Sequence, residues 1–139
     1  LSLHDALPIL PGEIIDVLVV RRGIAPQRLL PLLQAWERGR QALEHDPAAA
    51  AALLAIGTDL SETDYLQTLK GLKLLPLDIS LQELRQDEHG HSPLAAQGRL
   101  MERTLQRLQL LSRPVDWKTL IDDRALRLWQ AGAATKGQP

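Results

Sequence analysis

The sequence predicts an α/β fold in which helices predominate and one strand is clear. A short run rich in β-branched residues indicates the strand. Capping residues ahead of apolar, periodic stretches indicate helices along the rest of the chain. Aromatic residues make up only 3% of the 139 residues, with no Phe, so leucine and alanine must form most of the core. A Leu/Ala core favours helices that pack on other elements.

The predicted strand is the run IIDVLVV, which begins at Ile14 and ends at Val20, after the turn signal Pro11-Gly12. The run is too short and too continuously apolar for an amphipathic helix. A strand that is apolar on both faces is typical of a sheet covered by helices on both sides. The short stretch 72–77 is the one other segment that could pair with it.

One helix is expected next, which begins after Gly23 and ends near Glu44. Pro31 either lies in the first turn of this helix, where its missing N–H has no partner to lose, or kinks the helix. Asp46-Pro47 is an N-cap followed by proline at the first helical position. The helix it predicts runs through an alanine tract to Ile56, and Gly57 is placed to end it.

The remaining elements follow the same capping logic. Ser61 with Asp64 resembles a capping box and predicts a helix to about residue 70. Residues 78–80 are expected to cap a short helix, and Ser92-Pro93 to cap the longest one. The expected helices are 81–85, 94–111, a short turn at 116–120 and 123–131, with a polar loop at 86–91 and a flexible tail at 132–139.

Composition and motifs exclude several function classes. The net charge of −1 lacks the basic excess of a nucleic-acid-binding protein, and no apolar run is long enough to span a membrane. Without cysteine the chain has no disulfide, thiolate metal site or cysteine nucleophile. No phosphate-binding loop, nucleophile elbow or zinc-protease motif is present. Adjacent Asp122 and Asp123 are better explained as helix caps than as a catalytic pair, so we expect no enzyme, catalytic residue or cofactor.

Two polar clusters have both a functional and a structural interpretation. The loop Asp87-Glu88-His89-Gly90-His91 carries metal-ligating side chains, but its spacing matches no standard ligand pattern. A solvated loop without a metal is therefore expected. Arginines recur every four residues at 99, 103 and 107, as on a helix that meets phosphates or anionic lipid, or simply faces solvent.

Asp16 interrupts the apolar run of the predicted strand. A buried carboxylate is costly unless it is paired, so Asp16 is expected to bond a neighbouring backbone group or arginine. Alternatively, it lies near the strand end and faces a ligand crevice, where open α/β sheets bind small molecules.

Residues 1–9 (LSLHDALPI) resemble the translation of a sequencing adapter, which would make them non-native.

The rest of the chain resembles one known family. From residue 10 onward, the order of signals is PGEIIDVLVV, an Ala35-Trp36 helix, Asp46-Pro47 with an Ala-rich helix, LSE followed by GLKLL, and the segment 116–128. This order resembles the substrate-binding proteins of ABC importers for nitrate, aliphatic sulfonates, taurine and thiamine precursors.

The resemblance implies that residues 10–131 form the C-terminal part of a type II periplasmic-binding-protein fold. It implies an extracytoplasmic or periplasmic protein that binds a small anionic or zwitterionic solute and delivers it to ABC permease subunits at the membrane, with no nucleic acid. Asp16, with Glu13 near it, would line the ligand cleft and suit an ammonium group. The alternatives are a Leu-rich helical protein-interaction module without a small-molecule ligand, and a related enzyme of thiamine-precursor synthesis for which no catalytic residue is found.

Overall fold

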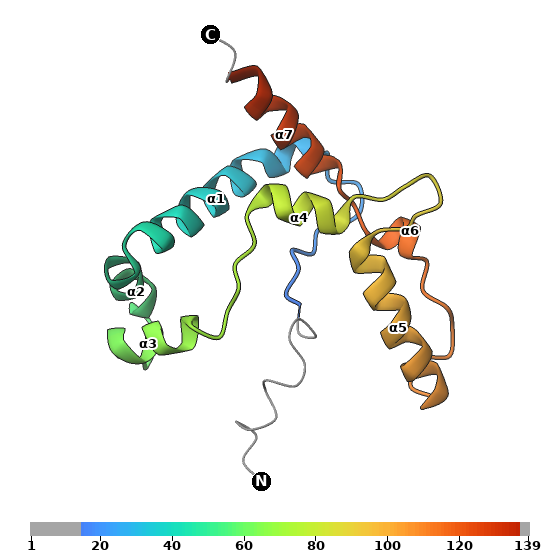
Figure 1. Cartoon of the computed structure of the whole chain (residues 1–139), viewed down its shortest axis with the longest axis horizontal. Helices are drawn as coiled ribbons and strands as arrows, with labels where there is room; N and C mark the ends of the chain where they lie inside the picture. The colour runs from blue at the N-terminus through green and yellow to red at the C-terminus, as the bar shows by residue number, and fades with distance from the viewer. Residues whose placement is uncertain (1–14, 137–139) are drawn as a thin grey trace.

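The structure is a computed structural model that describes residues 15–136, with side chains up to Ala133. Within this part of the chain every regular element is helical, so the fold class is all-α (Figure 1). The elements are the 3₁₀ turn η3 (Pro26–Leu29), α1 (Leu30–His45), α2 (Pro47–Ala55), α3 (Glu62–Leu69), α4 (Leu77–Leu84), α5 (Pro93–Arg107), α6 (Trp117–Leu120) and α7 (Arg124–Lys136).

The predicted α/β fold, and with it the C-terminal portion of a periplasmic-binding-protein fold, is wrong. Residues 15–21 form no regular structure, and residue 14 lies outside the described residues. Val19 is 83% exposed, not buried within a sheet. The physical reason is the lack of a partner: a strand needs neighbours for its backbone N–H and C=O groups. The other candidate stretch, 72–76, is irregular and leads directly into α4.

The first helices form largely as the caps predict. Pro31 lies in the first turn of α1, directly after η3, so the helix begins there instead of kinking. Asp46 caps α2, and its Oδ1 accepts a hydrogen bond from the backbone N–H of Ala49 at 3.0 Å. Gly57 follows the end of α2 with φ of 83°, a backbone conformation that glycine adopts without strain.

Two later caps are also confirmed, and a third, at Asp116, was not predicted. The Ser61 hydroxyl accepts from the N–H of Asp64 at 3.2 Å at the start of α3. Ser92 caps α5 in the same way, and Asp116 caps the short α6. These residues fix where the helices begin because each supplies an acceptor to an otherwise unpaired first-turn N–H group.

The predicted start of α4 is wrong by four residues, because the helix begins at Leu77 rather than at residue 81. Its N-cap residue, Pro76, offers no capping side chain. Instead, Oε2 of Glu37, on α1, accepts a hydrogen bond from the N–H of Leu77 at 3.3 Å. The cap therefore comes from a residue 40 positions away, which local sequence reasoning misses.

Two helix ends also differ from the prediction. α5 ends at Arg107 rather than at 111, because Gln109 adopts φ of 57° and the N–H of Leu110 turns back to the carbonyl of Leu105 at 2.9 Å. α7 continues to Lys136, five residues beyond its predicted end. Residues 137–139 of the predicted tail lie outside the described residues.

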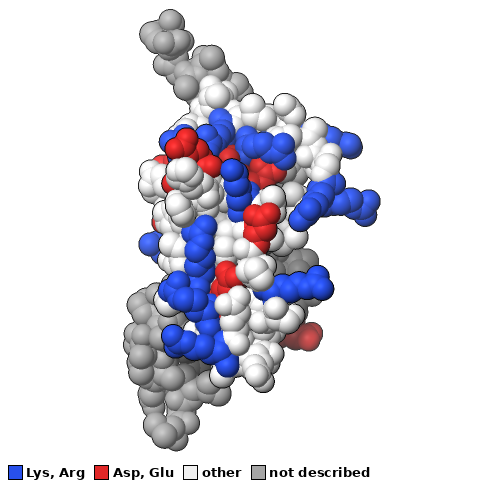
Figure 2. Space-filling view, turned by 90° about the vertical axis from the view of Figure 1, so that its right-hand side faces the viewer, with Lys and Arg blue, Asp and Glu red and all other residues white. Residues whose placement is uncertain are grey.

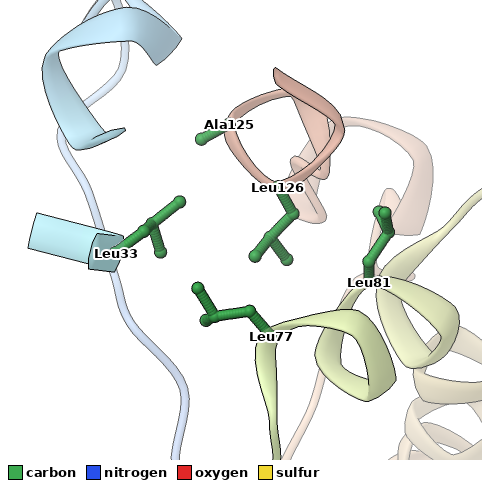
Figure 3. Packing of buried hydrophobic residues seen from close by; sticks show 5 residues of the cluster. All are labelled: Leu33, Leu77, Leu81, Ala125 and Leu126. Carbon is green, nitrogen blue, oxygen red and sulfur yellow. The ribbon is translucent and has the colours of Figure 1, made fainter. Parts of the chain in front are cut away.

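The core is small and lies where α1, α4 and α7 meet. Its five buried side chains point toward one another in Figure 3: Leu33, Leu77, Leu81, Ala125 and Leu126. Helices α1, α2 and α3 extend from one side of this junction, and α5 and α6 extend from the other (Figure 1). The helices of the described residues therefore form an open arrangement around this small buried cluster.

Candidate functional site

Of the two residues predicted to bind a ligand, the structure describes only Asp16. Asp16 is exposed, and within residues 15–136 no hydrogen bond or ion pair reaches its side chain. Glu13 lies outside the described residues. The surface hollows next to the α4–α5 loop and next to α6 do not include Asp16. Both interpretations of Asp16, the paired carboxylate and the ligand contact, therefore lack support from the described contacts.

The loop between α4 and α5 is organised by Asp87. Its Oδ1 accepts hydrogen bonds from the N–H groups of His89 and His91, at 2.9 and 2.8 Å, and its Oδ2 lies 3.0 Å from Nδ1 of His91. Gly90 adopts φ of 78° at the tip of the loop. The Asp87 carboxylate thus stabilises the loop by accepting hydrogen bonds from its backbone, as Asp side chains do in turns.

These contacts lower the pKa of Asp87 to about 2, mainly because the backbone N–H of His91 bonds to the ionised carboxylate. The acid is therefore ionised, and both of its oxygens have partners within the loop. Among the described residues no group of three or more His, Cys, Asp or Glu side chains is arranged to hold a metal ion. The loop has a structural explanation in its own hydrogen bonds.

A surface hollow of about 450 Å³ lies beside this loop, where α4 ends and α5 begins. Its lining combines a cation and an anion with apolar groups, and consists of Arg85, Gln86, Asp87, His91, Ser92, Pro93 and Ala96. Arg85, Asp87 and His91 are all exposed, so water competes fully with any polar ligand there. The hollow can receive a side chain of another protein but does not enclose a solute.

A second set of contacts joins α5 to the segment before α7. Oε2 of Glu102 accepts from the indole Nε1 of Trp117 at 2.7 Å, and Oε1 accepts from the N–H of Val115 at 2.9 Å. These bonds lower the pKa of Glu102, the Trp117 bond most of all. The indole lies directly over Gly98, where a methyl group would overlap its ring carbons. This arrangement holds α6 against α5.

The predicted arginine stripe lies on α5 but has mixed surroundings. Arg99 donates from Nη2 to the carbonyl of Gly90 at 3.2 Å, which ties the helix to the preceding loop. Arg103 and Arg107 are exposed. Figure 2 shows basic side chains along this side of the molecule with acidic side chains between them. The face is mixed in sign, which favours a solvated surface over a phosphate-binding one.

The most unusual surface of the described residues belongs to α2. Its nine residues, PAAAAALLA, include no polar side chain. Such a helix is ordinarily buried on all sides. Here Ala51 and Ala55 are buried, but Leu53 is 70% exposed and Ile56, directly after the helix, is 76% exposed. We define the α2 surface as Leu53, Leu54, Ile56 and Leu60, all of which are exposed.

Other apolar side chains are also uncovered. Leu32 and Trp36 lie one turn apart on α1 and are about half exposed, as is Met101 on α5. Several apolar side chains of the described residues are thus uncovered outside the α2 surface.

Sequence reasoning did not identify the α2 surface. The alanine tract predicts a helix and tight packing, but a sequence does not say which neighbour will cover it. The available signal was the absence of any polar position across the whole helix, which indicates burial against more than one partner. Within the described residues, α2 packs mainly against α1 and α3.

Comparisons with known proteins identify no relative: no protein-family model, curated protein or solved structure matches this chain. Among the described helices, none has the length and apolar character needed to cross a membrane.

Proposed function

We propose that the chain functions as a helical docking module, which binds another polypeptide through the α2 surface. The observation that carries this proposal is a helix without polar residues, in which Leu53 lies in solvent, as does Ile56 directly after the helix. Exposed contiguous apolar area of this kind marks interaction sites in soluble proteins.

The composition of α2 indicates the chemistry of the partner. The helix offers no charged group and no side-chain hydrogen-bond donor or acceptor. A partner gains little from charged or polar groups here, because those groups would lose water without a replacement. The fitting partner presents leucine-type or aromatic side chains, such as the apolar face of an amphipathic helix.

A photo-crosslinking experiment tests this function. A benzophenone amino acid placed at Leu53 should crosslink the chain to its partner polypeptide and give one discrete adduct, identified by mass spectrometry. The additional substitution Ile56→Lys should abolish that adduct. The matched control places the same probe at Gln97, an exposed position on α5. Equal adducts at both positions, or none at Leu53, would contradict the proposal. Circular dichroism of Ile56→Lys separates a lost surface from a lost fold, since a side chain that is 76% exposed should not affect folding.

A second candidate function is the solute-binding component of an ABC importer, for a small anionic or zwitterionic solute such as taurine, a sulfonate, nitrate or a thiamine precursor. The specific observation in its favour is the order of the helices. The helix that carries Ala35-Trp36, the Asp46-capped α2 and the Ser61-capped α3 occur in the order that the resemblance implies. Permease subunits and an extracytoplasmic location belong to this candidate.

Calorimetric titration distinguishes the two candidates. Saturable heat with taurine that Asp16→Asn weakens, with nitrate binding unaffected, is expected of the importer component. The reason is that an ammonium group gains from a carboxylate and nitrate does not. The absence of heat with taurine, nitrate and ethanesulfonate would remove Asp16 as a solute contact in this chain and favour the docking module.

A further inference from the structure

The segment that precedes η3 is a second uncovered apolar element, separate from α2. Ile15, Val17, Leu18 and Val19 are between 45% and 83% exposed. The segment runs as an open trace outside the helices (Figure 1). Within residues 15–136 no hydrogen bond reaches the backbone of residues 15–20. Its peptide groups and its side chains are therefore both available for pairing.

The residue types favour one kind of pairing. Val and Ile fit the pleated surface of a sheet, and an unpaired row of N–H and C=O groups is a template for another strand. The described part of the chain contains no strand that could supply the pairing. The occupant must then come from another chain or from residues outside the described ranges, and the charges at the two ends of the segment discriminate between arrangements.

We propose that residues 16–22 pair in antiparallel fashion with the same residues of a second copy, in the register centred on Val19. In a two-fold symmetric antiparallel pair the axis is normal to the ribbon, and one residue faces its own copy. The numbers of any two facing residues then sum to twice the central number. With Val19 at the centre, Leu18 faces Val20 of the second copy.

This register alone pairs the charges. With Val19 at the centre, Asp16 faces Arg22 of the second copy, and symmetry repeats the pair at the other end. A register centred on Leu18 places Asp16 opposite Val20, and one centred on Val20 places it opposite Ile24, beyond the turn. A parallel, in-register pair sets each charge beside its own copy, which is destabilising.

The local backbone limits the paired segment to these residues. The N–H of Ile24 donates to the carbonyl of Arg21 at 3.4 Å, and Gly23 adopts φ of 85°. The chain therefore turns here, with Arg22 and Gly23 as the two central residues of the turn. The ribbon ends where the charge pair ends, and the helices begin beyond it.

Single cysteines test the register, because the chain contains no cysteine of its own. Facing Cβ atoms lie about 4.5–5.5 Å apart, so Val19→Cys should form a disulfide-linked dimer on mild oxidation. Val17→Cys faces Arg21 of the second copy and should crosslink more slowly. Faster crosslinking of Val17→Cys than of Val19→Cys would contradict the register, and the absence of any dimer would contradict the pairing.

Charge exchange tests the same pairing without crosslinking. Asp16→Arg places like charges opposite each other at both ends, and should weaken the dimer about tenfold in sedimentation equilibrium. Arg22→Asp should have the same effect, and the double variant should restore the dimer. No rescue by the double variant would overturn the proposed pairing. Leu53→Lys is the control on α2: it should leave this dimer intact, so failure of the α2 docking surface and failure of the strand pairing give different results.

Discussion

The indole Nε1 of Trp117 donates a hydrogen bond to Oε2 of Glu102 at 2.7 Å, and this bond joins α6 to α5. The same carboxylate accepts from the N–H of Val115, so one side chain fixes both the ring and the loop before it. The ring then covers Gly98, one turn earlier on α5. A glycine in the middle of a helix is ordinarily unfavourable, and here it makes space for an aromatic ring.

Gly98→Ala should therefore destabilise the protein, by about 1–3 kcal/mol, because the new methyl group overlaps the Trp117 ring. Alanine ordinarily stabilises a helix by about 1 kcal/mol relative to glycine, so the sign of the change is informative. Gly39→Ala is the matched control, since nothing lies within 4 Å of a methyl group there and the helix should become more stable. Urea unfolding followed by circular dichroism measures both changes. Stabilisation by both variants would show that the ring does not occupy this position.

A second prediction compares a buried leucine with an exposed one. Leu81 is 2% exposed in the core, and Leu81→Ala should lower the free energy of unfolding by about 2–5 kcal/mol. Leu53 is 70% exposed on the α2 surface, and Leu53→Ala should change it by less than about 0.5 kcal/mol. Thermal melts of both variants provide the measurement. A large cost for Leu53→Ala would mean that this side chain is covered within the chain's own fold.

A third prediction concerns the cap that Glu37 supplies to α4. Its carboxylate accepts from the N–H of Leu77 at 3.3 Å and from Nη2 of the buried Arg40 at 2.6 Å. Glu37→Ala leaves both donors without this acceptor and should cost about 1–3 kcal/mol. Glu44 is the control: it also pairs with Arg40 but is largely exposed, so Glu44→Ala should cost less than about 1 kcal/mol. Equal costs in chemical unfolding would mean that the Leu77 bond contributes nothing.

The sequence predicted the helices whose starts are set locally. Asp46, Ser61 and Ser92 each supply an acceptor three residues before the N–H group that they cap, and this spacing is visible in a single sequence. The start of α4 was not visible, because its cap comes from Glu37 on another helix. Likewise, no residue near Gly98 in the sequence indicates that the ring of Trp117 covers it.

The strand was predicted wrongly for a related reason. The β propensity of the run ending at Val20 describes what its side chains fit, but a sheet requires a second strand, which the described residues do not supply. The prediction that Asp16 contacts a ligand depended on the same sheet. Asp16 is a ligand residue only if a sheet places it at a crevice, and without the sheet its carboxylate lies in solvent. Propensity thus predicts local geometry, whereas burial depends on partners that lie far away in the sequence.

The loop between α4 and α5 provides a pH-dependent prediction. The pKa of Asp87 is about 2, well below its ordinary value of 3.8, because N–H groups of the loop bond to the ionised carboxylate. A lowered pKa in the folded state means that ionised Asp87 stabilises the fold above pH 3.8. This contribution decreases as the pH falls toward 2. Asp87→Asn should melt at a lower temperature than the wild type at pH 5, and the difference should disappear near pH 2.

Subtracting the two melting curves isolates Asp87 from Glu37, Glu102 and Asp122, whose pKa values are also lowered. Glu88→Gln is the control in the same loop, because this side chain is 85% exposed and pairs only with His89. Its melting temperature should follow the wild type across the whole range. A difference between Asp87→Asn and wild type that stays constant from pH 5 to pH 2 would show that the carboxylate's charge does not organise the loop. The lower melting temperature of Asp87→Asn would then come from the hydrogen-bond geometry of the asparagine amide alone.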